Sequence, residues 1–297
     1  MIICAADIHF RWTKPPSRIG TLEEFIETQF NKFEFMLNYG RKHHYPTIVI
    51  AGDLFHQSTG CPAWMFSRLI RLIKEYNYDG SDDAYGTITA IPGQHDLPYH
   101  QSDLLHTSNM SVLVDSDMLD DAYGLYALFP WASKIVESKK RIAIVHQMVI
   151  ESDKHQLYPH QAEEKGIVTA KELLKQFPCY KLIVSGDNHR PFAVEHGGCW
   201  LVNPGSMTRQ RLGENHIPGF YTWDNGKVER IEFPCEQNVL ADIRTEKLNN
   251  WTGDLSKIYE IMDEIDESQS EDFTTVAQEY FKKHNIRPEV QKLILGK

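Results

Sequence analysis

Residues 47–56 read TIVIAGDLFH, an apolar run followed by a glycine, a carboxylate and, three residues later, a histidine. The run at 47–51 is short and rich in Ile and Val, which is typical of a buried β-strand. Asp53 and His56 follow at the point where such a strand ends. In open α/β sheets, ligands bind at the carboxyl ends of the strands. This stretch therefore predicts an α/β fold with a functional site at the edge of its sheet.

The same arrangement recurs four times, after apolar runs at residues 2–6, 87–91, 141–145 and 181–185. The polar side chains after these runs are Asp7 and His9, then Gln94, His95 and Asp96, then His146, and finally Asp187, Asn188 and His189. If all five runs are strands whose carboxyl ends meet, these side chains converge on one site.

The ligand types at this predicted site restrict its chemistry. Carboxylate and amide oxygens together with imidazoles, without a cysteine among them, suit Mn²⁺, Mg²⁺ or Fe²⁺ and disfavour a structural zinc site. Seven candidate ligands exceed the four that a tetrahedral ion takes, so we expect two ions. Two ions about 3.5–4 Å apart activate a water and neutralise a phosphoryl group during in-line displacement. The pattern predicts phosphoester hydrolysis.

Five motifs in this order resemble the fingerprint of the calcineurin-like metallophosphoesterases. The motifs are D-x-H at 7–9, G-D at 52–53, G-Q-H-D at 93–96, the histidine at 146 and G-D-N-H at 186–189. The resemblance covers roughly residues 1–235. Within that superfamily, G-D-L-F-H at 52–56 and N-P-G-S at 203–206 are similar to the SbcD-type DNA repair nucleases, a group that includes phage recombination nuclease subunits.

The resemblance implies a four-layer α/β/β/α sandwich with two metal ions, Mn²⁺ first, with Mg²⁺ and Fe²⁺ as alternatives. It assigns one ion to Asp7, His9 and His189, the other to Gln94, His146 and Asp187, and the bridging position to Asp53.

It also implies catalytic roles beside the metals. His95 would stabilise or protonate the leaving alkoxide, and Asp96 would orient the ring of His95 or support its charge. His56 would contact a phosphate or nucleotide. Two positions depart from the family pattern, because Gln94 replaces an asparagine and Asp187 replaces a histidine. An anionic oxygen at 187 shifts the metal preference further towards Mn²⁺ or Mg²⁺.

Helical signals separate the strands, as a layered sandwich requires. Thr21 with Glu24 and Thr169 with Glu172 predict capping boxes, and Pro62 predicts another helix start. Glycine-containing turns at 197–198 and 225–226 predict two hairpins of a mostly antiparallel sheet within residues 192–233. We expect a catalytic domain at 1–235 and an acidic, mostly helical segment at 236–297, which is either a shortened capping domain or a clamp on the catalytic domain.

Composition indicates a cytoplasmic enzyme without a membrane span. The first strand begins at Ile2, and no apolar stretch reaches the roughly 20 residues that a bilayer requires. The five cysteines are odd in number and lack paired spacing, as in reduced proteins.

The net charge of −10 argues against a nuclease that grips DNA alone, because tight DNA binding draws on many Lys and Arg contacts to phosphates. The resemblance implies an SbcC-type ATPase as the partner that supplies this grip. It also implies a homodimer, formed through helices around residues 62–76.

Three functions follow from these observations. The first is a DNA nuclease of recombination or repair, which the G-D-L-F-H motif favours. The second is a phosphatase for monoesters. The third is a non-catalytic scaffold in which Gln94 and Asp187 no longer hold two metals, and the retained Asp53 and His95 argue against it.

Overall fold

The computed structural model describes residues 1–240 except 79–84, 121–123, 153–166, 212–213 and 235–238, and residues 241–297 lie outside the described part. Residues Met1–Leu240 form one compact unit. Its strands are β1 Ile2–Ala5, β2 Thr47–Ile50, β3 Thr87–Ala90, β4 Ala127–Phe129, β5 Ile142–His146, β6 Val149–Ile150, β7 Val168–Thr169, β8 Leu182–Gly186, β9 Phe192–His196, β10 Cys199–Asn203, β11 Gly219–Asp224 and β12 Lys227–Glu232. Its α-helices are α1 Leu22–Lys42, α2 Ala63–Asn77, α3 Asn109–Asp115 and α4 Ala170–Gln176, and three short 3₁₀ helices cover Gln94–Asp96, Pro98–His100 and Ser102–Thr107.

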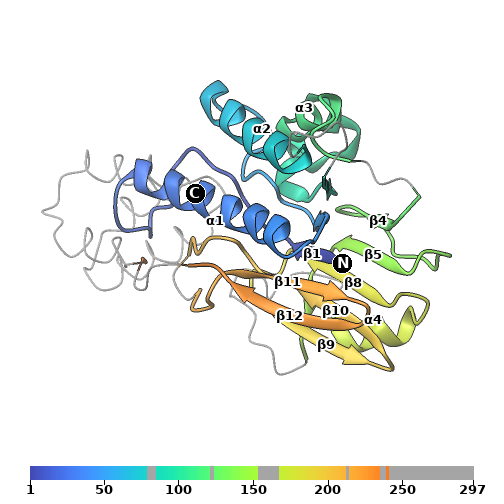
Figure 1. Ribbon diagram of the computed structural model, residues 1–297. Helices are drawn as coiled ribbons and strands as arrows, with labels where there is room; N and C mark the ends of the chain where they lie inside the picture. Colours follow the sequence, from blue (N-terminus) through green and yellow to red (C-terminus); the bar gives the residue numbers. More distant parts are fainter. Residues whose placement is uncertain (79–84, 121–123, 153–166, 212–213, 235–238, 241–297) are drawn as a thin grey trace, which may run out of the picture. The chain divides into compact units, whose positions relative to one another are not determined.

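Two five-stranded sheets form the centre of this unit (Figure 1). The first has the order β12-β11-β1-β2-β3, in which β1, β2 and β3 are parallel and β11 runs antiparallel to β1. The second has the order β4-β5-β8-β10-β9, in which only β9 is antiparallel to its neighbour. The parallel strands of each sheet therefore end at one edge, where a site can form.

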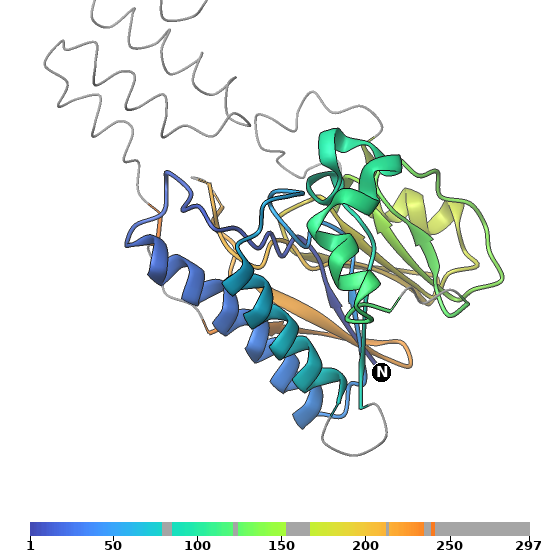
Figure 2. The same cartoon turned by 90° about the horizontal axis from the view of Figure 1, so that it is seen from above.

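Helices cover the outer faces of the two sheets. Long helices α1 and α2 lie side by side on the first sheet (Figure 2). Phe30 and Phe33 of α1 belong to the hydrophobic core of this half. On the second sheet, α4 buries Leu173 against Ile183 of β8. A third core between the sheets contains residues of both, such as Cys4, Val49, Val184 and Val202. The expected α/β/β/α layering is confirmed.

Local sequence explains where the helices begin. Thr21 accepts a hydrogen bond from the Glu24 N–H at 3.1 Å, and the Glu24 carboxylate accepts one from the Thr21 N–H at 2.8 Å. Thr169 and Glu172 form the same reciprocal pair at the start of α4. Pro62 is the N-cap residue of α2 and forms no side-chain cap hydrogen bond, so the helix begins one residue after it. The three expected helix starts are confirmed, and the two capping boxes depend on residues only three positions apart.

The sheet arrangement completes one expectation and corrects another. The five predicted strands form, with β1, β2 and β3 in one sheet and β5 and β8 in the other. The expected hairpins also form, yet they make no sheet of their own: β11 pairs with β1, and β10 pairs in parallel with β8. Each hairpin covers an edge that would otherwise leave backbone groups of a buried strand without partners.

In the described part of the chain, no helix is long and apolar enough to cross a bilayer. The expected acidic segment at 236–297 lies outside the described residues, apart from Val239 and Leu240, and its predicted helices and the proposed domain border stay predictions.

Candidate metal centre

Turns at the strand ends present the candidate ligands in an unusual backbone conformation. The φ angles are 48° at Asp7, 50° at His9, 52° at Asp53 and 88° at Asp187. For a residue other than glycine this left-handed region costs roughly 1–2 kcal/mol, although Asp and His visit it more readily than most residues. Four strained positions at one edge indicate that the surrounding fold holds these side chains in place.

Two motif glycines are required by close approach. A Cβ atom on Gly52 would lie 2.0 Å from Nδ1 of His146, and one on Gly93 would lie 2.1 Å from Oδ1 of Asp53. Neither position has space for a side chain. The G-D and G-Q-H-D motifs thus bring their loops into direct contact with the ligands themselves.

The ligands expected for the first ion lie together. Asp7, His9 and His189 form a group whose ligand atoms lie within 4.8 Å of one another. The Nε2 atoms of the two histidines are 3.2 Å apart, and the Asp7 carboxylate accepts the N–H of Asp187 at 3.1 Å. Two imidazoles facing one another beside a buried carboxylate are the donor set that a divalent cation binds.

Asp53 lies between the two halves of the site. Its Oδ1 accepts the His95 N–H at 2.9 Å, whereas its buried Oδ2 has no hydrogen-bond partner. This Oδ2 is 3.6 Å from Nε2 of His9 and 3.7 Å from Nε2 of His146. Burial raises the pKa of Asp53 well above its usual range, although His146 opposes the shift. An unpartnered buried carboxylate oxygen is energetically costly. Asp53 therefore fits the position of a carboxylate that bridges two cations.

The ligands expected for the second ion are joined to one another by hydrogen bonds. The Gln94 side-chain oxygen is 2.6 Å from Nε2 of His146, and its nitrogen donates to Asp187 at 2.9 Å. Nδ1 of His146 lies 2.7 Å from the Ala51 carbonyl and donates a hydrogen bond to it. This bond orients the ring so that Nε2 faces the centre of the site. His146 also groups with Asp7 and Asp53, whereas Asp187 belongs to none of the three candidate groups found among the described residues.

Charge at this position favours a protonated imidazole in the absence of metal. Burial alone would lower the pKa of His146, but the carboxylates around it, Asp53 first, raise it to about 9.

His95 and His56 lie beside the first ligand group. A ring nitrogen of each is within 4.8 Å of one of His9, and the two rings stack at 5.1 Å with 18° between their planes. Nδ1 of His95 is 3.0 Å from the His56 carbonyl, which fixes the ring orientation. Burial, followed by the charges of neighbouring histidines, holds the pKa of His95 well below its usual range.

Asp96 has partners other than the expected ring. Its fully buried carboxylate accepts the N–H groups of Leu54 at 3.1 Å, Phe55 at 2.9 Å and Gly93 at 3.0 Å. Burial raises its pKa to about 6 against the opposing effect of these three donors. The geometry therefore gives Asp96 the task of holding together the loops that carry Asp53 and the G-Q-H-D motif. Its catalytic role stays a prediction.

Glu214 is a part of the site that the sequence did not reveal. It is 1% exposed in its side chain, and its Oε1 lies 3.2 Å from Nδ1 of His189. The other oxygen accepts the N–H groups of Gln210 at 2.5 Å and Arg211 at 3.1 Å. A carboxylate behind a histidine ligand fixes the tautomer of the ring and its orientation. No motif spacing marks this residue, because only the fold brings positions 189 and 214 together.

The N-P-G-S turn at 203–206 supports the same histidine. The Asn203 amide donates to the carbonyls of Asn188 at 2.5 Å and Arg190 at 2.7 Å, and the Ser206 N–H donates to the His189 carbonyl at 3.1 Å. The turn therefore packs directly against the loop of the last motif.

A model of the calcineurin-like phosphoesterase superfamily domain matches residues 1–225. Among solved structures, TT1561 of Thermus thermophilus is 12% identical with a TM-score of 0.45, and the match covers 78% of this chain and 97% of that chain. A novel archaeal phosphodiesterase is 13% identical with a TM-score of 0.36, covering 78% and 99%. Vps29 of Entamoeba histolytica complexed with Zn²⁺ is 17% identical with a TM-score of 0.33, covering 78% and 98%. No curated protein matches the sequence.

Proposed function

The chain belongs to the calcineurin-like phosphoesterase superfamily, and we propose that it is a two-metal phosphodiesterase that hydrolyses DNA in recombination or repair. The observation that carries this proposal is the buried, unpartnered Oδ2 of Asp53, which lies between His9 and His146 where the strand ends of two sheets meet. A carboxylate in that position is suited to bridge two cations.

In this proposal Asp7, His9 and His189 hold one ion, and Gln94, His146 and Asp187 hold the other. When bound, divalent ions, Mn²⁺ first, would polarise the phosphoryl group and activate a water. Glu214 keeps His189 in the tautomer that presents Nε2 to the centre. The Ala51 carbonyl does the same for His146.

His95 acts on the leaving group. Its ring is oriented by the His56 carbonyl and lies 5.0 Å from the ring of His9, so it faces substrate held at the first ligand group. Nδ1 keeps the hydrogen that it donates to the His56 carbonyl, so the ring gives a proton to the departing oxygen only from its doubly protonated form. A substrate phosphate beside the ring favours that form against the effect of burial on the pKa of His95. A positioned general acid is typically worth about 10²- to 10⁴-fold in rate. His56, stacked on His95, contacts a phosphate or nucleotide of the substrate.

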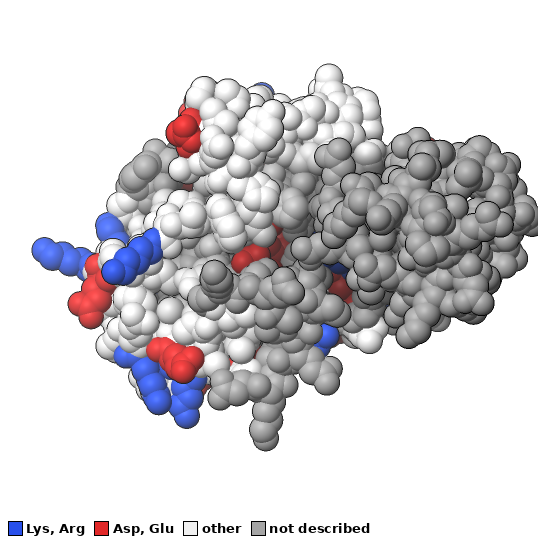
Figure 3. Space-filling view, turned by 180° about the vertical axis from the view of Figure 1, so that it is seen from behind, with Lys and Arg blue, Asp and Glu red and all other residues white. Residues whose placement is uncertain are grey.

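The preference for DNA rests on the G-D-L-F-H and N-P-G-S motifs, and the DNA grip is proposed to come from a partner. On the face in Figure 3, the Lys and Arg side chains of the described residues lie in separate groups rather than in one continuous band. A chain with a net charge of −10 gains little from phosphate contacts of its own. An SbcC-type ATPase is the proposed partner, and a homodimer through the region of α2 is the proposed assembly.

The proposed site of action is the cytoplasm. The cysteines of the described residues, Cys4, Cys61, Cys179 and Cys199, are free thiols, as expected in a reducing compartment.

The decisive experiment compares three substrates in the presence of Mn²⁺: bis-p-nitrophenyl phosphate, p-nitrophenyl phosphate and linear duplex DNA. We expect hydrolysis of the diester and of DNA, and loss of both in His95→Asn and Asp53→Ala. His44→Asn is the matched control, because His44 is exposed and has φ 59°, which asparagine tolerates. Faster turnover of the monoester without DNA cleavage would instead identify a phosphatase.

One observation favours a non-catalytic scaffold as a second candidate. Gln94 satisfies both His146 and Asp187 by hydrogen bonds, so these three side chains have partners without a second ion. A scaffold predicts a single bound ion and no hydrolysis with any substrate. Elemental analysis after reconstitution with Mn²⁺ separates the two, because the nuclease requires two ions per chain.

A further inference from the structure

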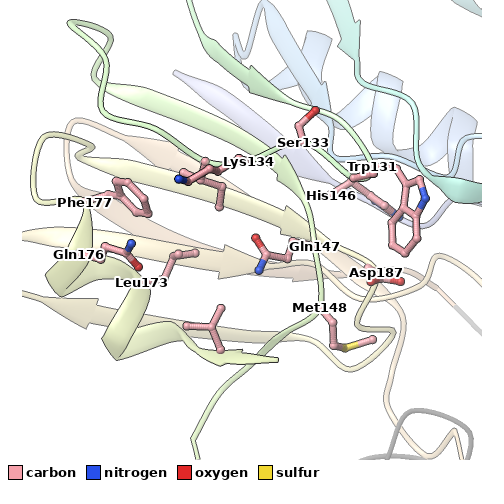
Figure 4. Close-up of a pocket in the computed structure, with 13 residues that line it drawn as sticks. Trp131, Ser133, Lys134, His146, Gln147, Met148, Leu173, Gln176, Phe177 and Asp187 are labelled. Carbon is pink, nitrogen blue, oxygen red and sulfur yellow. The ribbon is translucent and has the colours of Figure 1, made fainter. Parts of the chain in front are cut away.

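A cavity of about 540 Å³ lies next to the candidate ligands of the second ion, and the proposed function does not use this cavity. It lies between the loop after β4, the segment that links β5 to β6, and helix α4 (Figure 4). Its lining includes His146 and Asp187 themselves. A volume in the range of roughly 300–1,000 Å³ is typical of sites for small ligands. Whatever occupies this cavity touches the group at which the phosphate is held.

Trp131 forms the wall at the metal end. Its ring lies 6.3 Å from the ring of His146, edge to face at 66°, and Figure 4 shows the two side by side above Asp187. The Trp131 backbone N–H donates to the Pro92 carbonyl at 3.0 Å, which ties its loop to the chain just before Gln94. The indole is half-buried, so part of its surface stays open to the cavity.

The loop holds Trp131 by a tight turn. Ser133 donates its N–H to the Pro130 carbonyl at 3.0 Å, and Ala132 between them has φ 62°. Alanine in this left-handed region is uncommon and strained. A strained turn directly after an aromatic residue at the edge of a site indicates that the position of that residue is fixed by the fold.

The remaining lining combines apolar surface with amide groups. Leu173 and Phe177 of the α4 region are buried at the far end, and Gln147 lies between them and Trp131 (Figure 4). Gln176 and Lys134 are exposed, and Figure 4 shows them beside Phe177 at the same far end. Amides donate and accept hydrogen bonds at once, which matches the mixed edges of nucleobases.

We propose that this cavity receives the nucleobase of the nucleotide next to the phosphate under hydrolysis, with Trp131 as the surface on which the base stacks. The inference rests on the proposed function and adds a substrate-recognition residue to it. A flat aromatic wall accepts any base, because every base has a π-face, and the site therefore reads the presence of a base rather than its identity.

The test measures binding of 2′-deoxyadenosine 5′-monophosphate and of 2-deoxyribose 5-phosphate by calorimetry with Mn²⁺ present. Stacking of one base predicts that the nucleotide binds wild type about 5- to 100-fold more tightly than the sugar phosphate. Trp131→Ala should remove this ratio and leave the sugar phosphate affinity unchanged, whereas Trp131→Phe should retain most of it. Leu125→Ala is the control, because Leu125 is 67% exposed, lines no part of the cavity and lies outside the proposed dimer region.

Equal binding of both ligands to wild type, or an unchanged ratio in Trp131→Ala, would overturn the proposal. So would tighter binding of O-phosphotyrosine than of the nucleotide, since that points to a protein substrate. If Trp131→Ala does not fold, Trp131→Leu keeps apolar volume and removes only the aromatic face. If the protein cleaves DNA but the ratio of nucleotide to sugar phosphate affinity does not change in Trp131→Ala, the base-binding proposal is refuted and the nuclease proposal stands. If nucleotide binding depends on Trp131 but DNA is not cleaved, the nuclease proposal is refuted and the base-binding proposal stands.

Discussion

Replacing Glu214 with glutamine should weaken binding of the first metal ion by about 10- to 100-fold, the usual effect of losing a carboxylate behind a histidine ligand. In the native protein Oε1 of Glu214 faces Nδ1 of His189 at 3.2 Å, and the other oxygen accepts the N–H groups of Gln210 and Arg211. A glutamine that keeps its oxygen on those two donors must present its NH₂ group to Nδ1.

That exchange reverses the role of Nδ1. Facing a donor, Nδ1 becomes the acceptor, and the proton of the neutral ring moves to Nε2, the atom that has to bind the ion. The loss corresponds to about 1.4–2.7 kcal/mol. Glu214→Ala should show the same loss of metal affinity and also a lower free energy of unfolding, because two buried N–H groups lose their acceptor at about 1–3 kcal/mol each.

Calorimetric titration of chelator-treated protein with Mn²⁺ measures both sites, and urea unfolding in chelator measures stability. Glu75→Gln, on the exposed side of α2, is the control for removal of one negative charge. The reasoning is refuted if Glu214→Gln binds both ions with wild-type affinity.

Further predictions concern the other parts of the site. His95→Asn should lower kcat by about 10²- to 10⁴-fold while two ions still bind, and an equal loss of metal in that variant would contradict a role in proton transfer. Asp96→Asn should lower the free energy of unfolding by about 1–3 kcal/mol in urea titrations, because the NH₂ group of the new asparagine would face one of the three N–H donors that Asp96 accepts. Unchanged stability would show that these hydrogen bonds do not hold the two loops together. Gln94→Ala should remove binding of the second ion and preserve the first, and retention of both ions would exclude Gln94 as a ligand. The pKa of His146 is raised to about 9 without metal, so binding of the second ion must release a proton from its ring. The affinity for the second ion should therefore rise about tenfold per pH unit from pH 7 to 9 and level off above pH 9. Calorimetry that finds no dependence on pH in this range would contradict the proposed charges around His146.

Sequence reasoning predicted the features that depend on neighbouring residues. The capping boxes at Thr21 and Thr169 and the five strands before the motifs all follow from patterns a few residues long. Such patterns carry no information about which strands are neighbours, so the two β layers were predicted but the assignment of each strand to a layer was not. Strands of two or three residues, such as β4 and β6, are too short to show any periodicity.

The same limit applies to the site. The candidate ligands that lie near Asp53, such as His9 and His146, stand at or directly after the end of a strand, and this position made them visible in the sequence. Glu214 and Trp131 lie in loops without a motif, and their partners are 25 and 15 positions away, at His189 and His146. Asp96 was placed beside the correct histidine, but whether a carboxylate faces a ring or three backbone N–H groups is decided by tertiary packing.

The two halves of the metal centre come from different layers of the protein. Asp7, His9, Asp53 and Gln94 follow strands of the first sheet, whereas His146, Asp187 and His189 end or follow strands of the second. Cations held between these side chains would join one layer to the other, so their binding would contribute to folding stability. An ion at one hundred times its dissociation constant adds about 2.7 kcal/mol to folding stability. We therefore expect chelation to lower the free energy of unfolding by weakening the contact between the two layers.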